Sequence, residues 1–289
     1  MGLAVSGGPD SMALLALASE LGRDAIAVAT VNHGLRPEAA DECAMVADAC
    51  AAWSIPCTIL TVTLASGNLQ QEARRARYAA LEDWARGQGV GVVATAHHAD
   101  DQAETLLMRL NRGSGVSGLA GIREMQIIGD DYRVIRPLLG FRRAQLQVIA
   151  AQAGLATVDD PSNADDHYDR VRMRKALAQA DWLDMAAIAR SASHLAETDR
   201  ILEALAVDKW DQRALVSKGE VRVPQSGWLD TDARMLIRAI AHLGGSAGFG
   251  DAFNLASRLA SGGGKGNIGG VLIEKRADFY LCQPEPPRK

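Results

Sequence analysis

The chain has 289 residues, of which 48% are hydrophobic and 23% charged, and its formal net charge is −4. This composition excludes a disordered chain, and the length favours two domains. No apolar run approaches the roughly 20 residues of a membrane span, and the net charge does not by itself indicate a nucleic-acid partner. The four cysteines form no C-x-x-C pair, so we expect a cytoplasmic protein without a zinc site, disulfides or a membrane partner.

A glycine-rich turn follows the first apolar run. Leu3–Val5 predicts a strand and Asp10–Leu21 a helix. The turn between them consists of Ser6, Gly7, Gly8, Pro9, Asp10 and Ser11. Glycines allow a phosphate to approach the backbone, and N–H groups at a helix start donate to it. An ordinary turn is the alternative, but the position favours a phosphate site, although the Gly-Lys-Ser/Thr of a Walker A loop is absent.

The first half of the chain continues with alternating apolar runs and helical patterns. The expected strands are Ala25–Val31, Thr58–Val62 and Val92–Ala96, and the expected helices are Pro37–Trp53, Leu69–Arg86 and Asp101–Arg112. This alternation favours an α/β fold whose parallel sheet carries helices on both faces. Ligands bind such sheets at the carboxyl ends of the strands. The polar residues Ser6, Asn32-His33 and His97-His98 each follow a strand and should therefore gather on one rim.

Two carboxylates begin the helix after Val92–Ala96. Asp101 and Glu104 are three residues apart and therefore share a helix face. Acidic residues in a first turn complement the helix dipole, which is one explanation. The other is a site for a metal ion or a cationic substrate. The spacing is not H-E-x-x-H, so we do not expect a zinc hydrolase.

Two basic clusters are candidates for phosphate contacts. Arg74 and Arg77 lie three residues apart and could clamp a phosphate from one side. The second cluster consists of Arg170, Arg172, Arg174 and Lys175. Within it, Arg170 and Arg174 share a helix face while Arg172 points elsewhere. A solvated helix surface is the alternative for both clusters.

The second half of the chain is mainly helical. The expected helices are Arg142–Ala153, Tyr168–Ala178, Met185–Leu205, Thr231–Leu243 and Asp251–Ala260. The expected strands are Ala214–Ser217, Val221–Val223, and a hairpin of Gly270–Glu274 and Phe279–Cys282 after a glycine-rich turn at 262–266. Residues 159–163 are expected to form a loop, and the tail after Gln283 to be disordered. The pattern predicts a boundary near Ala192, hence a domain at 1–192 and a smaller, mainly helical domain at 193–289.

Four motifs occur in a characteristic order. They are Ser6–Ser11; Val31–Arg36; Glu72–Tyr78 with His97–Thr105 and Arg112–Gly115; and Asp160–Asn163 with Tyr168 and Arg170–Arg174. In this order the chain resembles the tRNA(Ile)-lysidine synthetases, which are PP-loop ATP pyrophosphatases, over residues 2 to 178 and more loosely to about 282. Val171 and Met173 depart from the Arg-Asn-Arg-Ile-Arg run of such relatives. Val171 stands where those relatives have the asparagine of this run, so no contact from that asparagine amide is expected here.

The resemblance implies an ATP-dependent ligation on isoleucine tRNA. ATP would adenylylate the cytidine at the first anticodon position, and free lysine would then displace AMP to form lysidine. The implied ATP-binding residues are Ser6–Ser11, Asn32, His33 and Arg74, with Mg²⁺ on Asp10 and Asp101. The implied catalytic or lysine-binding residues are Asp10, Asp101 and Glu104. The implied contacts to tRNA or phosphate are Arg77, Arg112, Arg170, Arg172, Arg174 and Lys175, and a homodimer is a candidate assembly.

Other functions remain open from the sequence. Another PP-loop tRNA-modifying enzyme such as a 2-thiolase would need cysteine pairs for an iron–sulfur cluster or persulfide. An NAD or GMP synthetase would need ammonia delivery, and no glutaminase-like segment is apparent. A non-catalytic tRNA-binding module is a third alternative, against which Asp10, Asp101 and Glu104 argue. The region after Ala192 shows no catalytic constellation, so we expect it to position the tRNA.

Overall fold

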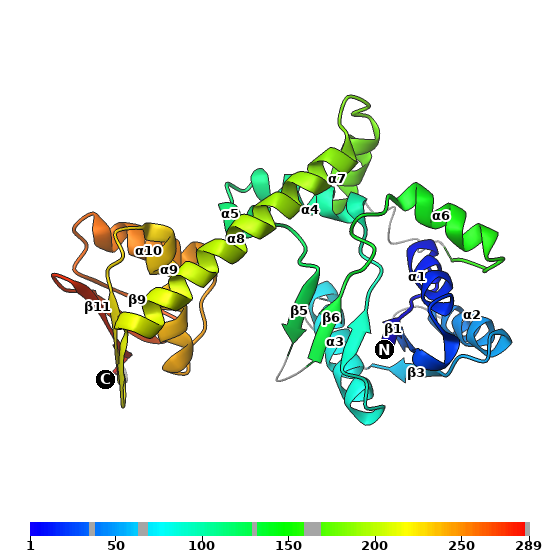
Figure 1. Ribbon diagram of the computed structural model, residues 1–289, viewed down its shortest axis with the longest axis horizontal. Coiled ribbons are helices and arrows are strands. Elements are labelled where there is room, and N and C mark those ends of the chain that lie inside the picture. The colour runs from blue at the N-terminus through cyan, green and yellow to red at the C-terminus, as the bar shows by residue number, and fades with distance from the viewer. Residues whose placement is uncertain (35–37, 63–68, 129–131, 159–168, 287–289) are drawn as a thin grey trace. The chain divides into compact units, whose positions relative to one another are not determined.

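The computed structural model describes residues 1–34, 38–62, 69–128, 132–158 and 169–286 (Figure 1). The chain divides into two compact units. The first comprises residues 1–108 and 121–192, and the second residues 109–120 and 193–289. Residues 109–120 thus belong to the second unit, although the sequence placed them within the first domain. Among the described residues, no helix is long and apolar enough to cross a membrane.

The first unit contains a six-stranded sheet in the order β3-β2-β1-β4-β6-β5. Its strands are β1 (Gly2–Ala4), β2 (Ala27–Asn32), β3 (Cys57–Thr61), β4 (Val92–Ala94), β5 (Met125–Ile128) and β6 (Tyr132–Ile135). All neighbouring strands are parallel except β5, which pairs antiparallel with β6 at the edge. The predicted α/β fold with a mainly parallel sheet is confirmed. The strands β5 and β6 were not predicted.

Helices cover both faces of this sheet. On one face, α1 (Pro9–Ser19), α2 (Glu38–Ala52) and α6 (Arg143–Gln152) bury a core that includes Leu3, Met12 and Leu146. On the other face, α3 (Leu69–Gly87) buries Leu81 and Trp84. The first unit also contains η1 (Arg23–Ala25), nearly all of α4 (Ala99–Leu110), and α7 (Asp169–Ala178), whereas α5 (Val116–Leu119) lies in the segment 109–120 of the second unit. Burial on both faces explains why the strands read as continuous apolar runs.

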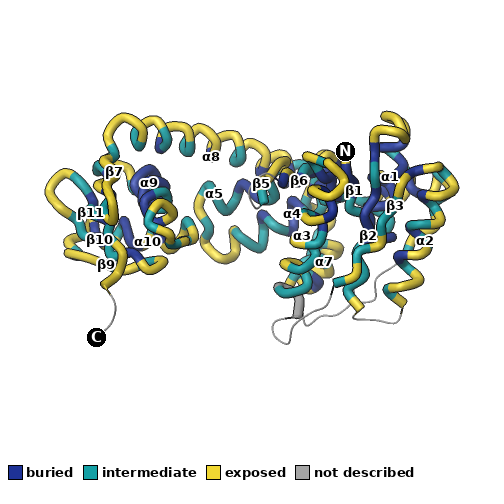
Figure 2. The backbone as a smooth tube through the Cα atoms, turned by 90° about the horizontal axis from the view of Figure 1, so that it is seen from below, coloured by how far each residue is buried: buried dark blue, intermediate teal, exposed yellow. Residues whose placement is uncertain are grey.

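The second unit is built on an antiparallel sheet in the order β7-β8-β11-β10-β9. Its strands are β7 (Leu215–Ser217), β8 (Glu220–Pro224), β9 (Lys265–Ile268), β10 (Val271–Lys275) and β11 (Phe279–Pro284). The helices α9 (Leu229–His242) and α10 (Phe249–Ala260) pack on the sheet around Leu236 and Leu259. A long helix, α8 (Met185–Arg213), continues across Ala192, and exposed residues occur along its whole length whereas α9 is largely buried (Figure 2).

Two expectations for this unit were wrong in part. The turn expected at 262–266 ends earlier, because Lys265–Ile268 form β9 and pair with β10. The tail expected to begin after Gln283 is ordered through Pro284, which pairs with Val271. The predicted hairpin itself is confirmed, and β9 extends it to three strands.

A buried ionic network should make a large contribution to the stability of the second unit. The guanidinium of Arg234, 5% exposed, contacts Asp199, Glu203 and Asp230 at 2.5, 3.0 and 2.6 Å. Arg234→Met would remove this cation from Asp199 and Asp230, whereas Glu203 would keep its contact with Arg238. Removing one partner of a buried pair costs about 3–5 kcal/mol. We therefore expect a clear fall in the melting temperature. Arg200→Met on α8 removes an exposed ion pair with Glu197 and should change the melting temperature little. Equal melting temperatures for the two variants would contradict this expectation.

Candidate active site

The parallel strands place the predicted rim residues at one edge of the sheet. The loop from Ser6 follows β1, Asn32-His33 ends β2, and His97-His98 follows β4. A further polar residue, Arg136, follows β6 in the same way. Because these strands are parallel, their carboxyl ends lie at the same edge, where ligands bind α/β sheets.

Hydrogen bonds within the first loop hold its shape. The Ser11 hydroxyl accepts from the Ser6 N–H at 3.1 Å and donates to the Gly8 carbonyl at 2.9 Å. Gly7 has φ +84°, and a Cβ there would lie 3.0 Å from the Met45 side chain. Pro9 begins α1 directly after Gly8. Gly7 is thus required by conformation and space, and the loop presents a helix N-terminus, which favours an anion.

Asp10 points toward His98 across this rim. The Asp10 Oδ2 atom lies 3.4 Å from His98 Nε2, and His98 Nε2 is also 3.5 Å from Asp101 Oδ2. Burial alone would lower the pKa of His98, but the hydrogen bond to Asp10 and the nearby aspartate charges raise it overall. The other Asp10 oxygen, Oδ1, is buried and has no hydrogen-bond partner. A buried carboxylate oxygen without a partner is uncommon and indicates a place for a cation or a donor from a ligand.

His98 also fixes the start of α4. Its ring Nδ1 accepts from the Asp101 N–H at 3.3 Å, and the Asp101 carboxylate accepts from the His98 N–H at 3.1 Å. This reciprocal pair has the pattern of a capping box. Next to it, Asp100 forms a bidentate pair with Arg142, with distances of 2.9–3.1 Å, and anchors the N-terminus of α6. Burial would raise the pKa of Asp100, but Arg142 lowers it overall.

Glu104 is buried on α4 and holds α7 by two arginines. Its side chain is 4% exposed, and it accepts from Arg170 Nε and Arg174 Nε, each at 2.8 Å. Arg170 also donates to Asp101 Oδ1 at 2.6 Å. Burial would raise the pKa of Glu104, but the two guanidinium groups lower it overall. Both predicted carboxylates therefore already hold cations, and helical spacing had placed Arg170 and Arg174 on one face as observed.

The pairing of Glu104 should give the stability a defined pH dependence. Because its pKa is lowered on folding from the ordinary 4.5, Glu104 stabilises the fold fully above pH 4.5. That contribution is lost as the pH falls through the lower, folded-state pKa. The difference in unfolding free energy between the wild type and Glu104→Gln should therefore shrink below pH 4.5. A difference that stayed constant over this range would contradict the ion pairing.

Arg74 and Arg77 lie over Tyr78, with distances of 5.0 and 5.5 Å from the guanidinium carbons to the ring centroid. Beside them, burial and Arg77 lower the pKa of His33. Burial lowers the pKa of His97 to about 4, despite the opposing charge of Asp101. Both imidazoles are therefore neutral at physiological pH.

The remaining predicted residues lie elsewhere. Arg172 pairs with Asp169 within α7, and Lys175 lies in the last turn of that helix. Arg112 belongs to the second unit. Leu35, Arg36, Asp160–Asn163 and Tyr168 lie outside the described residues. Sequence reasoning missed Tyr78 and Arg136 as members of the site, and it missed Arg142 as the anchor of Asp100.

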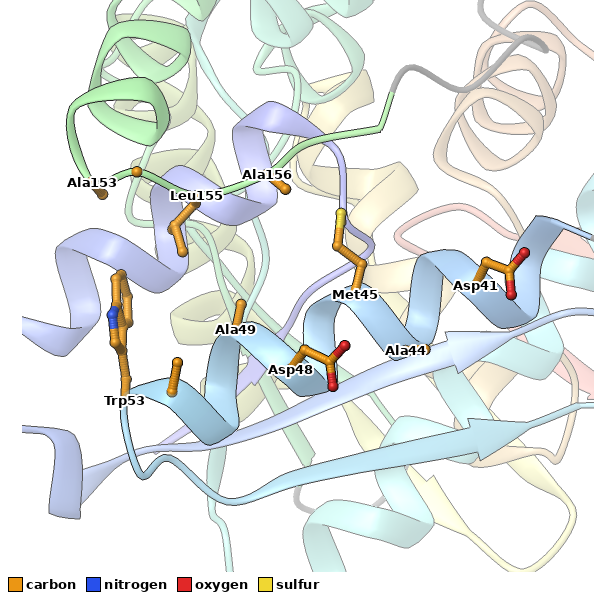
Figure 3. A pocket seen from close by; sticks show the side chains of 11 residues that line it. Asp41, Ala44, Met45, Asp48, Ala49, Trp53, Ala153, Leu155 and Ala156 are labelled. Carbon is orange, nitrogen blue, oxygen red and sulfur yellow. The ribbon is translucent and has the colours of Figure 1, made fainter.

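A cavity of about 480 Å³ lies between α2 and the segment 153–156 (Figure 3). It is lined by Met45, Trp53 and Leu155, with Asp41 and Asp48 also on its wall. None of the predicted site residues lines it. Among the described residues, no group of three or more His, Cys, Asp or Glu side chains forms a ready metal site.

Comparison with known proteins identifies close relatives. The PP-loop domain family matches residues 1–181. The tRNA(Ile)-lysidine synthase of Novosphingobium aromaticivorans is 46% identical, and the match covers 99% of this chain and 89% of that protein. The enzyme of the same name from Zymomonas mobilis is 39% identical, over 100% of this chain and 89% of the relative. The solved U34-tRNA thiolase of Methanococcus maripaludis shares the fold, with a TM-score of 0.56 and 18% identity over 68% of this chain and 72% of the thiolase.

Proposed function

We infer the activity of this chain from its family, because the chain belongs to the tRNA(Ile)-lysidine synthase family of PP-loop proteins. It is a ligase that uses ATP to join lysine to isoleucine tRNA and form lysidine. In the first step, O2 of the target cytidine attacks the α-phosphorus of ATP and pyrophosphate leaves. In the second step, the ε-amine of lysine attacks C2 of the adenylylated base and AMP leaves. The observation that carries this function is the hydrogen-bonded loop Ser6–Ser11, in which the Oδ1 atom of Asp10 is buried without a hydrogen-bond partner.

The loop supplies the phosphate site in this proposal. Backbone N–H groups and the N-terminus of α1 would hold the departing pyrophosphate, because a helix dipole favours negative charge there. His33 and Asn32, at the end of β2, would border the adenosine. Arg74 would meet the nucleotide phosphates. The lowered pKa of His33 keeps its imidazole neutral, which suits contact with the uncharged adenine base.

Mg²⁺ fits the residues at this rim. Asp10 Oδ1 is buried without a hydrogen-bond partner, and a hard cation is held by one or two carboxylates together with substrate phosphates. Asp10, with Asp101 beside it, would therefore hold the ion. Bound there, Mg²⁺ would neutralise charge on the leaving pyrophosphate.

Lysine is proposed to bind near Asp101 and Glu104. In the structure this pair holds Arg170 and Arg174, so the lysine ammonium would either replace Arg170 at Asp101 or bind beside it. Arg170 is 43% exposed and Arg174 30% exposed, so Arg170 is the more readily displaced. The 2-thiolase alternative is not favoured, because the relatives in this family are lysidine synthases.

The second unit is proposed to position the tRNA, with Arg170–Lys175 and Arg112 as further contacts. Adding isoleucine tRNA to the whole chain should therefore slow amide hydrogen exchange beyond Ala192 and in α7. Adding ATP alone should slow exchange only near Ser6–Ser11. Phosphate contacts require that tRNA binding weakens with salt. If tRNA slowed amide exchange only in residues before Ala192, the first unit would recognise the tRNA without the second unit.

The proposed function is tested most simply by its nucleotide products. Pyrophosphate and AMP should form when ATP, isoleucine tRNA and lysine are all present. Leaving out lysine should stop continued turnover. Formation of ADP and phosphate would exclude this chemistry.

A further inference from the structure

Three arginine side chains lie near Tyr78, a buried residue of α3. Arg74 and Arg77 lie over the Tyr78 ring, and Arg74 donates to its hydroxyl at 3.4 Å. Arg136 reaches the same tyrosine from the end of β6. Burial alone would raise the pKa of Tyr78, but the charges of these three arginines lower it overall. We call Arg74, Arg77 and Arg136 the arginine cluster.

The cluster carries positive charge without carboxylate partners, and its members range from the exposed Arg74 to the buried Arg136. Arg136 is 4% exposed, and it donates to the Arg123 carbonyl at 2.7 Å and to Gln126 Oε1 at 3.1 Å. Its Nε is buried and has no partner. Burial lowers the pKa of Arg77. Among the residues that the structure describes, no Asp or Glu forms an ion pair with any member of the cluster. A buried cation without a counter-ion, such as Arg136, is strongly unfavourable, so the cluster is suited to an anion that arrives from outside.

The groups around the cluster complete such a site. The Tyr132 hydroxyl and His33 Nδ1 are buried without hydrogen-bond partners. His97 is neutral, since burial and the charges of Arg136, Arg170 and Arg77 outweigh Asp101. Fixed guanidinium groups and neutral hydrogen-bonding groups together match an anion with several oxygen atoms, such as phosphate.

We propose that Arg77 and Arg136, the two less exposed members of the arginine cluster, bind a phosphate group of a substrate, and that this group is a phosphodiester of the tRNA beside the target cytidine. The assignment to tRNA rests on the proposed function. It is favoured by position, because β4 separates β6 from β1, which carries the loop Ser6–Ser11. Neighbouring strands lie about 4.8 Å apart, so the ends of β1 and β6 are about 10 Å apart. The loop and Arg136 therefore contact different phosphate groups.

The test combines a protein variant with a chemical change in the RNA. The probe is the anticodon stem–loop of isoleucine tRNA, either unmodified or with single neutral methylphosphonate linkages flanking the target cytidine. Charge-assisted hydrogen bonds predict that one such linkage weakens binding to the wild type about tenfold to a hundredfold. Arg77→Met should bind the unmodified RNA as weakly as the wild type binds the RNA with the neutral linkage. In this variant the neutral linkage should weaken binding no further. Arg75→Met is the matched control, because Arg75 is an exposed arginine of the same helix, and it should behave as the wild type.

A second arm separates tRNA from nucleotide. The ratio of AMP to adenosine affinity should be the same in the wild type and Arg77→Met. Arg77→Met could instead change the ratio of AMP to adenosine affinity and leave the effect of the methylphosphonate linkages as in the wild type. That result would overturn the tRNA assignment and place the nucleotide phosphate at the cluster. The cluster would not be a phosphate site at all if Arg77→Met left three properties as in the wild type. These are the RNA affinity, the effect of the methylphosphonate linkages and the ratio of AMP to adenosine affinity. Failure of the wild type to bind the RNA would instead contradict the proposed function.

Stability distinguishes this role from a structural one. Arg77 has no carboxylate partner among the described residues, so Arg77→Met removes an uncompensated charge. Its melting temperature should therefore equal or exceed that of the wild type while RNA binding falls. A lower melting temperature with unchanged RNA affinity would show that Arg77 only supports the fold.

Discussion

Asp10→Ala is expected to slow pyrophosphate release on the order of 10²- to 10³-fold, the loss typical when one electrostatic stabiliser of a developing charge is removed. Asp10 lies in the first turn of α1 with one oxygen unpartnered, so its carboxylate is free to act on the ligand. The substitution removes little apolar contact, and the melting temperature should stay close to that of the wild type. Pre-steady-state pyrophosphate release with saturating tRNA measures the effect.

Asp10→Asn provides the matched control for side-chain volume. It keeps the shape of the side chain and removes the charge, so it should be nearly as slow as Asp10→Ala. An Asp10→Asn variant with the wild-type rate would remove the charge of Asp10 from the mechanism. An unfolded Asp10→Ala would show that its contact with His98 is mainly structural.

Glu104→Gln is expected to affect both the docking of α7 and the use of lysine. The neutral amide removes the carboxylate that Arg174 contacts and leaves Arg170 with Asp101 only, and breaking a buried pair costs about 3–5 kcal/mol. We expect about 2–4 kcal/mol, because Arg170 is 43% and Arg174 30% exposed and solvent screens them. The concentration of lysine or Mg²⁺ needed for half-maximal rate should rise on the order of tenfold to a hundredfold. Chemical denaturation and steady-state kinetics measure the two effects.

Glu82→Gln on α3 is the control for this change. Glu82 pairs with Arg86 at 3.1 Å on the surface, and such pairs contribute about 0–1 kcal/mol. If Glu104→Gln left lysine and Mg²⁺ dependence unchanged but destabilised the fold, Glu104 would serve only to hold α7. If it changed neither property, the ion pairs would have no measurable role.

The sequence predicted the sheet because its strands are buried on both faces. β2 and β4 read as continuous Val- and Ala-rich runs, and the helices between them are long enough to show their period. The position of the loop and of the histidines then followed from parallel strand order. The edge strand β5 was missed because its first three residues are exposed and show no alternation. β9 was missed because Lys265, Gly266 and Asn267 are poor strand formers, and pairing with β10 determines its structure.

The connections within the site could not be predicted from spacing. Glu104 meets Arg170 and Arg174 across about seventy residues of chain, and only the fold brings α4 and α7 together. Arg136 gave no signal because it is a single arginine after a strand that was itself not expected. His98 as a helix cap was also missed, since Ser, Thr, Asp and Asn are the usual residues there.

The central claim is that this chain joins lysine to one cytidine of isoleucine tRNA. The most direct measurement supplies isotopically labelled lysine with ATP and the tRNA, followed by nuclease digestion and mass spectrometry of the fragments. We predict that the label appears only at the first anticodon cytidine, in equal amounts with the AMP and pyrophosphate formed. Label elsewhere in the tRNA, or AMP formation without labelled tRNA, would contradict the account.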